Sequence, residues 1–112
     1  MVATYDDASL VVNLLRWGTE MKMDEAYGTI FSPDYVADDP DPDLGDPSVN
    51  KVLYFGETIG ALVKHGVLDR GLILDIFWAD GLWPLVRSRA LMVRERSNDP
   101  RLYENFEALV TQ

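Results

Sequence analysis

The sequence predicts an all-α protein: a compact single domain spanning residues 1–112, with five or six helices packed around a central helix at about residues 47–65. Apolar residues recur at steps of three and four through most of the chain, which is the period of an amphipathic helix. No segment keeps the period of two that a strand would show. Groups of glycine, proline and aspartate separate the apolar stretches, and a chain of 112 residues can bury one substantial core.

The first third of the chain is predicted to hold two or three helices. A first helix begins after an N-cap at Asp6 or Asp7. Its apolar face is formed by Leu10, Val11, Leu14 and Leu15. A second helical pattern follows at 23–31, and the propensities of the residues in between leave open whether the two helices are continuous. A serine cap followed by proline then predicts a short helix that carries Tyr35 and Val36.

An acidic loop at about residues 38–47 combines proline, glycine and repeated aspartate, so it can hold neither a helix nor a central strand. Three of its aspartates alternate as the first ligands of an EF-hand do: Asp39, Asp41 and Asp43. The sixth position of that motif is Leu44 instead of glycine, and the twelfth is Asn50 instead of glutamate. We therefore expect a solvated loop, with no metal and no other cofactor.

The central helix is predicted to start where Asp46 and Pro47 suit the N-cap and first-turn positions, and to stop at Gly66. Its broad apolar arc is formed by Val49, Val52, Phe55, Ile59, Leu62 and Val63. Gly56 and Gly60 lie within this arc, and each costs about 1 kcal/mol of helix stability relative to alanine. We therefore expect another backbone to approach the helix closely at these glycines.

Three more helices are expected after the central one. Asp69 caps a short helix. The turn at Asp80-Gly81 precedes a helix that has Pro84 in its first turn and ends near Arg96. A last helix, Asp99–Gln112, closes one side of the domain. Its buried stripe consists of Leu102, Tyr103, Phe106, Leu109 and Val110.

Arg89 places a charge in the middle of an apolar helical stripe. That stripe is formed by Leu82, Leu85, Val86, Met92 and Val93. A guanidinium in such a place needs a carboxylate partner, and Glu57 and Glu107 are the candidates. The sequence therefore predicts a structural ion pair that specifies the fold.

Residues around Arg89 in the same helix offer a second kind of site: Trp83, Arg87, Arg94 and Arg96. In a structural interpretation, Arg87 lies against the Trp83 ring. Alternatively, the arginines form a patch for an anion such as phosphate, or for an acidic segment of a partner. Three arginines on one helix are common, so the structural interpretation is preferred.

The net charge is −9, and the imbalance lies in Met1–Asp46, which holds eleven acidic residues and two basic ones. Such a field repels nucleic acid and anionic membranes, so we expect neither direct nucleic-acid binding nor membrane association. The sequence shows no signal-peptide pattern and no uninterrupted apolar stretch of membrane-spanning length. We expect a soluble cytoplasmic protein, and the absence of cysteine is compatible with a reducing compartment.

The chain offers few groups for catalysis. It has no cysteine and no nucleophile motif, and its one histidine, His65, is placed to interact with the end of the central helix. We expect a non-enzymatic protein that acts through protein contacts or self-association, including as a homodimer, with Trp17 and Trp78 as exposed candidates. Two alternatives stay open: an acidic mimic of nucleic acid that binds a basic protein, and a small-ligand or enzyme pocket around Glu57 and Arg89.

Loose sequence patterns in Asn50–Val110 are similar to those of a known family. They are Tyr54-Phe55-Gly56-Glu57, then Gly66-Val67-Leu68-Asp69, then Trp83 ahead of a helix with Arg89, and finally Tyr103-Glu104-Asn105-Phe106-Glu107. On these patterns the chain resembles a family of small bacterial helical proteins known only as a domain of unknown function. The resemblance implies an all-helical fold and a paired structural role for Glu57 and Arg89. It implies no activity.

Overall fold

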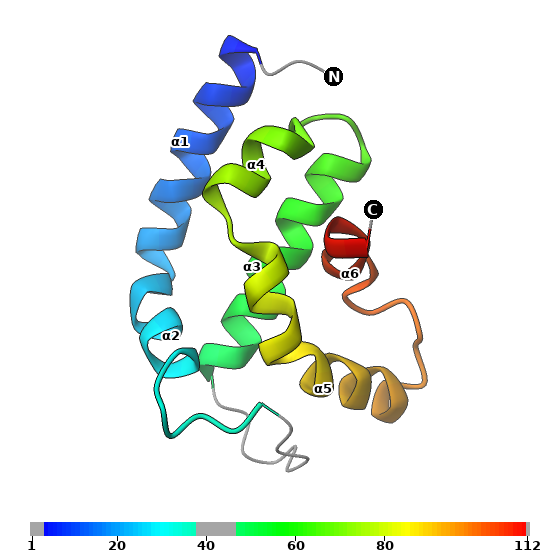
Figure 1. Ribbon diagram of the computed structural model, residues 1–112. Helices are drawn as coiled ribbons and strands as arrows, with labels where there is room; N and C mark the ends of the chain where they lie inside the picture. Colours follow the sequence, from blue (N-terminus) through cyan, green and yellow to red (C-terminus); the bar gives the residue numbers. More distant parts are fainter. Residues whose placement is uncertain (1–3, 38–46, 112) are drawn as a thin grey trace.

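Helix α3 (Pro47–Lys64) crosses the middle of the computed structural model, which describes residues 4–37 and 47–111 (Figure 1). The other helices are α1 (Tyr5–Glu20), α2 (Met23–Ile30), α4 (Arg70–Ile76), α5 (Ala79–Ser97) and α6 (Glu104–Thr111). In Figure 1, α1 and α2 form one edge of the molecule and α6 lies on the opposite side of α3. The described residues contain no strand, and the predicted all-α domain around a central helix is confirmed.

The N-terminal part of the chain forms two separate helices. Lys22 has a left-handed backbone with φ of 60°, which ends α1 and starts α2 in a new direction. The N-cap of α1 is Thr4 rather than the expected aspartate: the Thr4 hydroxyl accepts a hydrogen bond from the Asp7 N–H at 3.2 Å. Asp7 in turn accepts a hydrogen bond from the Thr4 N–H at 2.7 Å, which completes a capping box.

The short helix expected around Tyr35 and Val36 does not form, and residues 31–37 are turns and extended chain instead. The Tyr35 hydroxyl donates a hydrogen bond to the Leu85 carbonyl of α5 at 2.6 Å, whereas Val36 is exposed. This contact across the molecule fixes the segment in a non-helical course. The acidic loop and its alternating aspartates, at 38–46, lie outside the described residues, and Pro47 is the first residue of α3.

The core lies along α3, which packs most extensively against α6 and α2. A row of aromatic rings crosses it: the Phe55–Phe77, Phe77–Phe106 and Phe106–Trp83 ring centroids are 5.9, 5.8 and 5.1 Å apart. Burying a side chain of this size stabilises the fold by about 1.5–3 kcal/mol. The row therefore joins the central helix, the end of α4, α5 and α6 into one core.

Gly56 and Gly60 are where α6 meets α3, and the predicted close backbone approach is confirmed. A Cβ at Gly60 would lie 2.2 Å from the backbone oxygen of Asn105. A Cβ at Gly56 would lie 2.3 Å from the ring of Phe106, which is fully buried. No other residue type leaves room for α6 at these positions.

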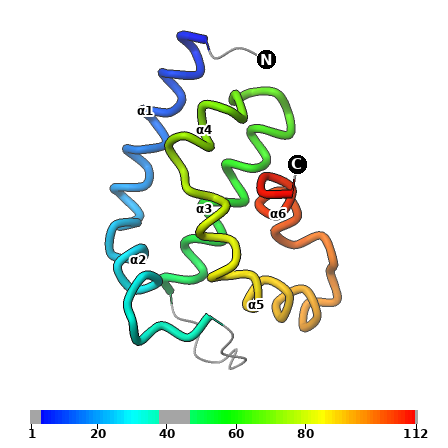
Figure 2. The backbone as a smooth tube through the Cα atoms, in the orientation of Figure 1, coloured from blue at the N-terminus to red at the C-terminus, as the bar shows by residue number. Residues whose placement is uncertain are grey.

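Asp7 ties the start of α1 to the start of α4, which lie side by side although α2 and α3 separate them in the chain (Figure 2). Its Oδ1 accepts a hydrogen bond from the Asp69 N–H at 3.1 Å. Asp69 caps α4, as predicted, because its Oδ2 accepts a hydrogen bond from the Leu72 N–H at 2.8 Å. Both aspartates are buried, so this junction is an internal polar contact between two helix ends.

This junction predicts an acid-sensitive contribution to stability. The hydrogen bond from the Thr4 backbone N–H holds the pKa of Asp7 below its ordinary value. The resulting stabilisation is complete above the unfolded-state pKa of about 4 and is lost as the pH falls through the lower folded-state pKa. We expect the thermal midpoint to fall more between about pH 6 and about pH 3 in the wild type than in Asp7→Asn.

Melting curves followed by circular dichroism at the two pH values check this expectation. Asp6→Asn is the matched control, because Asp6 is exposed on the same helical turn and makes no hydrogen bond to a described residue. It should keep the pH dependence of the wild type. Equal pH dependence in Asp7→Asn and the wild type would show that the junction does not contribute.

Candidate interaction surface

Glu57 caps the start of α6. Its Oε1 accepts hydrogen bonds from the backbone N–H groups of Asn105 and Phe106, both at 2.9 Å, and its Oε2 accepts one from the Asn105 side-chain amide at 2.8 Å. The backbone donors lie in the first turn of α6, where they have no partner within the helix. A carboxylate there also interacts favourably with the helix dipole. Glu57 therefore holds α6 on α3, and the expected pairing of Glu57 with Arg89 is corrected by these contacts.

Glu107, the other expected partner of Arg89, pairs with Arg94 instead. The Arg94 Nη2 and Glu107 Oε1 atoms are 3.0 Å apart, and Arg94 Nε donates to the Leu102 carbonyl at 2.6 Å. The chain turns back after α5, so α6 starts within reach of Arg94. Arg89 lies on the side of α5 that faces the end of α2, and neither glutamate lines the cavity there.

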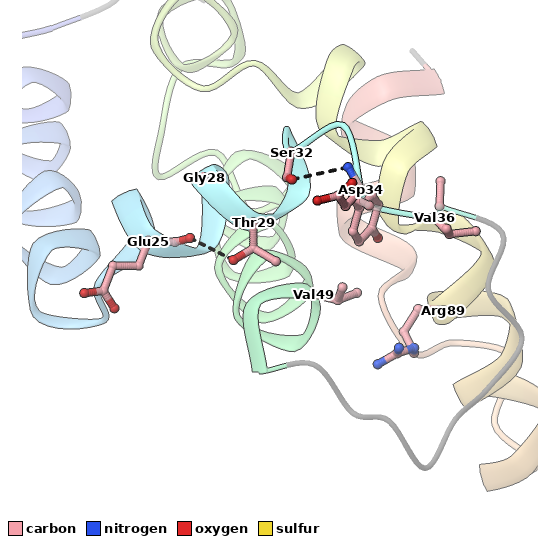
Figure 3. Close-up of a pocket in the computed structure, with 10 residues that line it drawn as sticks. Glu25, Gly28, Thr29, Ser32, Asp34, Val36, Val49 and Arg89 are labelled. Atoms are coloured by element: carbon pink, nitrogen blue, oxygen red, sulfur yellow. Dashed lines mark hydrogen bonds between the residues drawn. The ribbon is translucent and has the colours of Figure 1, made fainter.

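Arg89 lines a cavity of about 750 Å³ that also involves the end of α2 and the start of α3 (Figure 3). Val49 contributes an apolar part of the wall, and Thr29 contributes a hydroxyl that donates to the Glu25 carbonyl at 3.2 Å. Glu57 is not among the described residues that line this cavity. The structure therefore does not bring together the two residues of the hypothetical Glu57 and Arg89 pocket.

The expected patch of Trp83 with three arginines is divided between the core and the surface. Trp83 is buried with its ring against Phe106, so Arg87, which is exposed, cannot share a surface with it. Arg94 is engaged with Glu107, and Arg96 is exposed. The cause is the orientation of α5, which turns its Trp83 side toward α6.

A pair of exposed aromatic rings lies where the end of α2 meets the start of α5, and we call Phe31 and Trp78 the aromatic surface. Their ring centroids are 5.8 Å apart with an interplanar angle of 27°. The Trp78 side chain is 63% exposed and that of Phe31 49%. A Cβ at Gly81 would lie 2.2 Å from the Trp78 indole, so the indole lies flat on the first turn of α5. The aromatic surface is therefore both exposed and fixed in place.

The expected exposure of Trp78 is confirmed, whereas Trp17 is half-buried and stacks on Phe55 at a centroid distance of 5.0 Å. The exposure of Phe31 could not be predicted, because its position continues the apolar spacing of residues 23–31. A buried and an exposed residue at such a position give the same sequence pattern.

The charged residues nearest to Phe31 and Trp78 along the chain are acidic. Within five residues of Phe31 or Trp78 along the chain, the charged residues are Asp34, Asp75 and Asp80. All three are exposed. We call these three exposed carboxylates the negative margin of the aromatic surface.

The described residues contain no group of three histidine, aspartate or glutamate side chains placed to hold a metal ion. In the same residues, no helix has the length and apolar character needed to cross a membrane.

Comparison with known proteins places the chain in a family. No curated protein and no solved structure matches it. The family described as Domain of unknown function (DUF4760) matches residues 5–112, and so includes the N-terminal helices that the loose patterns of Asn50–Val110 leave out. With nearly its whole length matched, the chain belongs to the DUF4760 family, a domain of unknown function.

Proposed function

We propose that the protein is a non-enzymatic binding domain whose aromatic surface docks a segment of a partner protein that combines an apolar side chain with basic residues. The observation that carries the proposal is Trp78, which is 63% exposed although Phe31 and Gly81 fix its ring. A tryptophan that is already ordered loses little conformational entropy on binding. Exposed tryptophans of this kind contribute strongly to protein interfaces.

The charges around the aromatic surface favour a basic partner over a second copy of the chain. In a two-fold symmetric dimer the same patch meets itself, which would bring Asp34, Asp75 and Asp80 of both copies together. A basic segment meets the negative margin with complementary charge, and the net charge of −9 accelerates its approach.

Replacement of Trp78 by alanine is expected to weaken partner binding about 30-fold, which corresponds to the loss of about 2 kcal/mol at a central interface residue. The measurement uses tagged wild-type, Trp78→Ala and Tyr5→Ala baits with lysate of the native cell, followed by titration of the recovered partner. Tyr5 is the matched control, because it is an aromatic residue that is 85% exposed away from the aromatic surface. Tyr5→Ala should bind as the wild type does.

Salt and oligomeric state separate the alternatives. Binding to a basic partner should weaken as the salt concentration rises. Capture that Trp78→Ala leaves unchanged but DNA competes away would favour the acidic mimic of nucleic acid. Light scattering that shows a wild-type dimer and a Trp78→Ala monomer would make a second copy the occupant of the aromatic surface.

A further inference from the structure

A cleft of about 330 Å³ opens between α1, α2, α3 and the end of α4, away from the Arg89 cavity. Its apolar walls are formed mainly by Val11, Leu14, Phe55, Ile59, Ile73 and Phe77. The volume lies within the range of about 300–1,000 Å³ that small-molecule sites occupy. We call this space the apolar cleft.

The apolar cleft results from the way α1 is attached to the rest of the protein. At one end Asp7 joins α1 to the start of α4, and toward the other end Gly18 faces the Phe55 ring, 3.5 Å from the position of a Cβ. Between these two points, Val11, Leu14 and Leu15 of α1 line the cleft. The cleft therefore lies along a helix that is held near both ends.

Tyr27 supplies a polar group to these apolar walls. It lines the cleft, and its hydroxyl makes no hydrogen bond to any described residue. Burial raises the pKa of Tyr27 to about 12, so the phenol stays neutral and able to donate a hydrogen bond at physiological pH. The other hydroxyl in the cleft, that of Thr19, already donates to the Leu15 carbonyl at 3.0 Å.

We propose that the apolar cleft binds a small, neutral and largely apolar molecule that carries one hydrogen-bond acceptor for the Tyr27 hydroxyl. The apolar walls disfavour any ligand that would bury a charge. Asp24 also lines the cleft and repels anions in particular. This site is separate from the aromatic surface, so ligand binding here does not depend on the proposed function.

The test uses 6-propionyl-2-(dimethylamino)naphthalene, a neutral apolar ketone whose fluorescence reports the polarity and hydrogen bonding around its carbonyl. We expect saturable one-to-one binding with a blue shift of the emission. Tyr27→Phe should weaken binding about fivefold, as expected for one hydrogen bond. The variant removes only the hydroxyl, which has no bond to lose in the described part of the protein.

Two lysine variants on α1 locate the site. Leu15 and Val12 are 55% and 56% exposed on the same helix, but only Leu15 lines the cleft. Leu15→Lys should weaken binding of the ketone at least about tenfold, because it brings an ammonium group to the apolar mouth. Val12→Lys should leave binding unchanged, and both variants should melt as the wild type does because the replaced side chains are exposed.

Competition defines the class of ligand. Unlabelled 2-octanone should displace the probe, and octanoate of the same chain length should not. Stronger competition by octanoate would overturn the neutral class, and equal binding by Leu15→Lys and Val12→Lys would overturn the site. Trp78→Ala should bind the probe as the wild type does. The result for the cleft therefore does not depend on whether the aromatic surface binds a partner.

Discussion

Replacing Gly60 by alanine should destabilise the protein by at least about 2 kcal/mol and loosen α6 from α3. Added volume in a packed contact costs about 1–3 kcal/mol and sometimes more, whereas alanine regains about 1 kcal/mol of helix propensity. The clash is severe here because the new Cβ would lie 2.2 Å from a backbone oxygen, that of Asn105, rather than from a movable side chain. The steric cost therefore exceeds the gain in propensity.

Urea denaturation of the wild type and of Gly60→Ala measures the change in free energy of unfolding. Gly28→Ala is a control of opposite sign, because Gly28 also lies within a helix but has nothing within 4 Å of its Cβ position. It should stabilise the protein by up to about 1 kcal/mol. If Gly60→Ala stabilised the protein as Gly28→Ala does, the close contact of α3 with α6 would be refuted.

Replacing Glu57 by alanine should cost about 2–3 kcal/mol, because three donors at the start of α6 lose their acceptor together. Tyr103 has φ of 60° immediately before α6, so the chain enters the helix from a left-handed turn and Glu57 of α3 supplies the acceptor for the first turn. Glu57→Gln should cost less, about 1 kcal/mol, since an amide oxygen still accepts the backbone hydrogen bonds.

Chemical denaturation together with hydrogen exchange of the α6 amides checks this expectation. Glu104→Ala is the control, because its ion pair with Arg101 is at the surface and should contribute no more than about 1 kcal/mol. If Glu57 instead compensated Arg89, the variant Arg89→Met would cancel part of the cost of Glu57→Ala. The contacts of Glu57 predict that the two changes add to within about 0.5 kcal/mol.

The features that the sequence predicted depend on residues near one another in the chain. The Asp69 cap, the Pro47 start of α3 and the glycines of its apolar arc each follow from local pattern and propensity. The partners of Glu57 and Glu107 could not be predicted in this way, because they depend on where α6 comes to lie against α3 and α5. Tyr35 likewise takes its conformation from a hydrogen bond to Leu85, 50 positions away.

The candidate sites were predictable only in part for the same reason. Trp78 stood out as an aromatic residue after a short helix, but its stacking on Phe31 requires that the end of α2 meet the start of α5. The apolar cleft depends on how α1 lies against its neighbours, which no periodicity specifies. Tyr27 has the spacing of a core residue, and only the surrounding helices show that it lines a cleft.

The packing of α6 on α3 determines when the core can close during synthesis of the chain. Helix α3 emerges from the ribosome well before Phe106, whose ring covers Gly56 and completes the aromatic row of the core. Until then the glycine face of α3 has no cover, and the cap residue Glu57 has no helix start to bind. The N-terminal helices can form early, but the nascent chain cannot close its core before the last described helix is made.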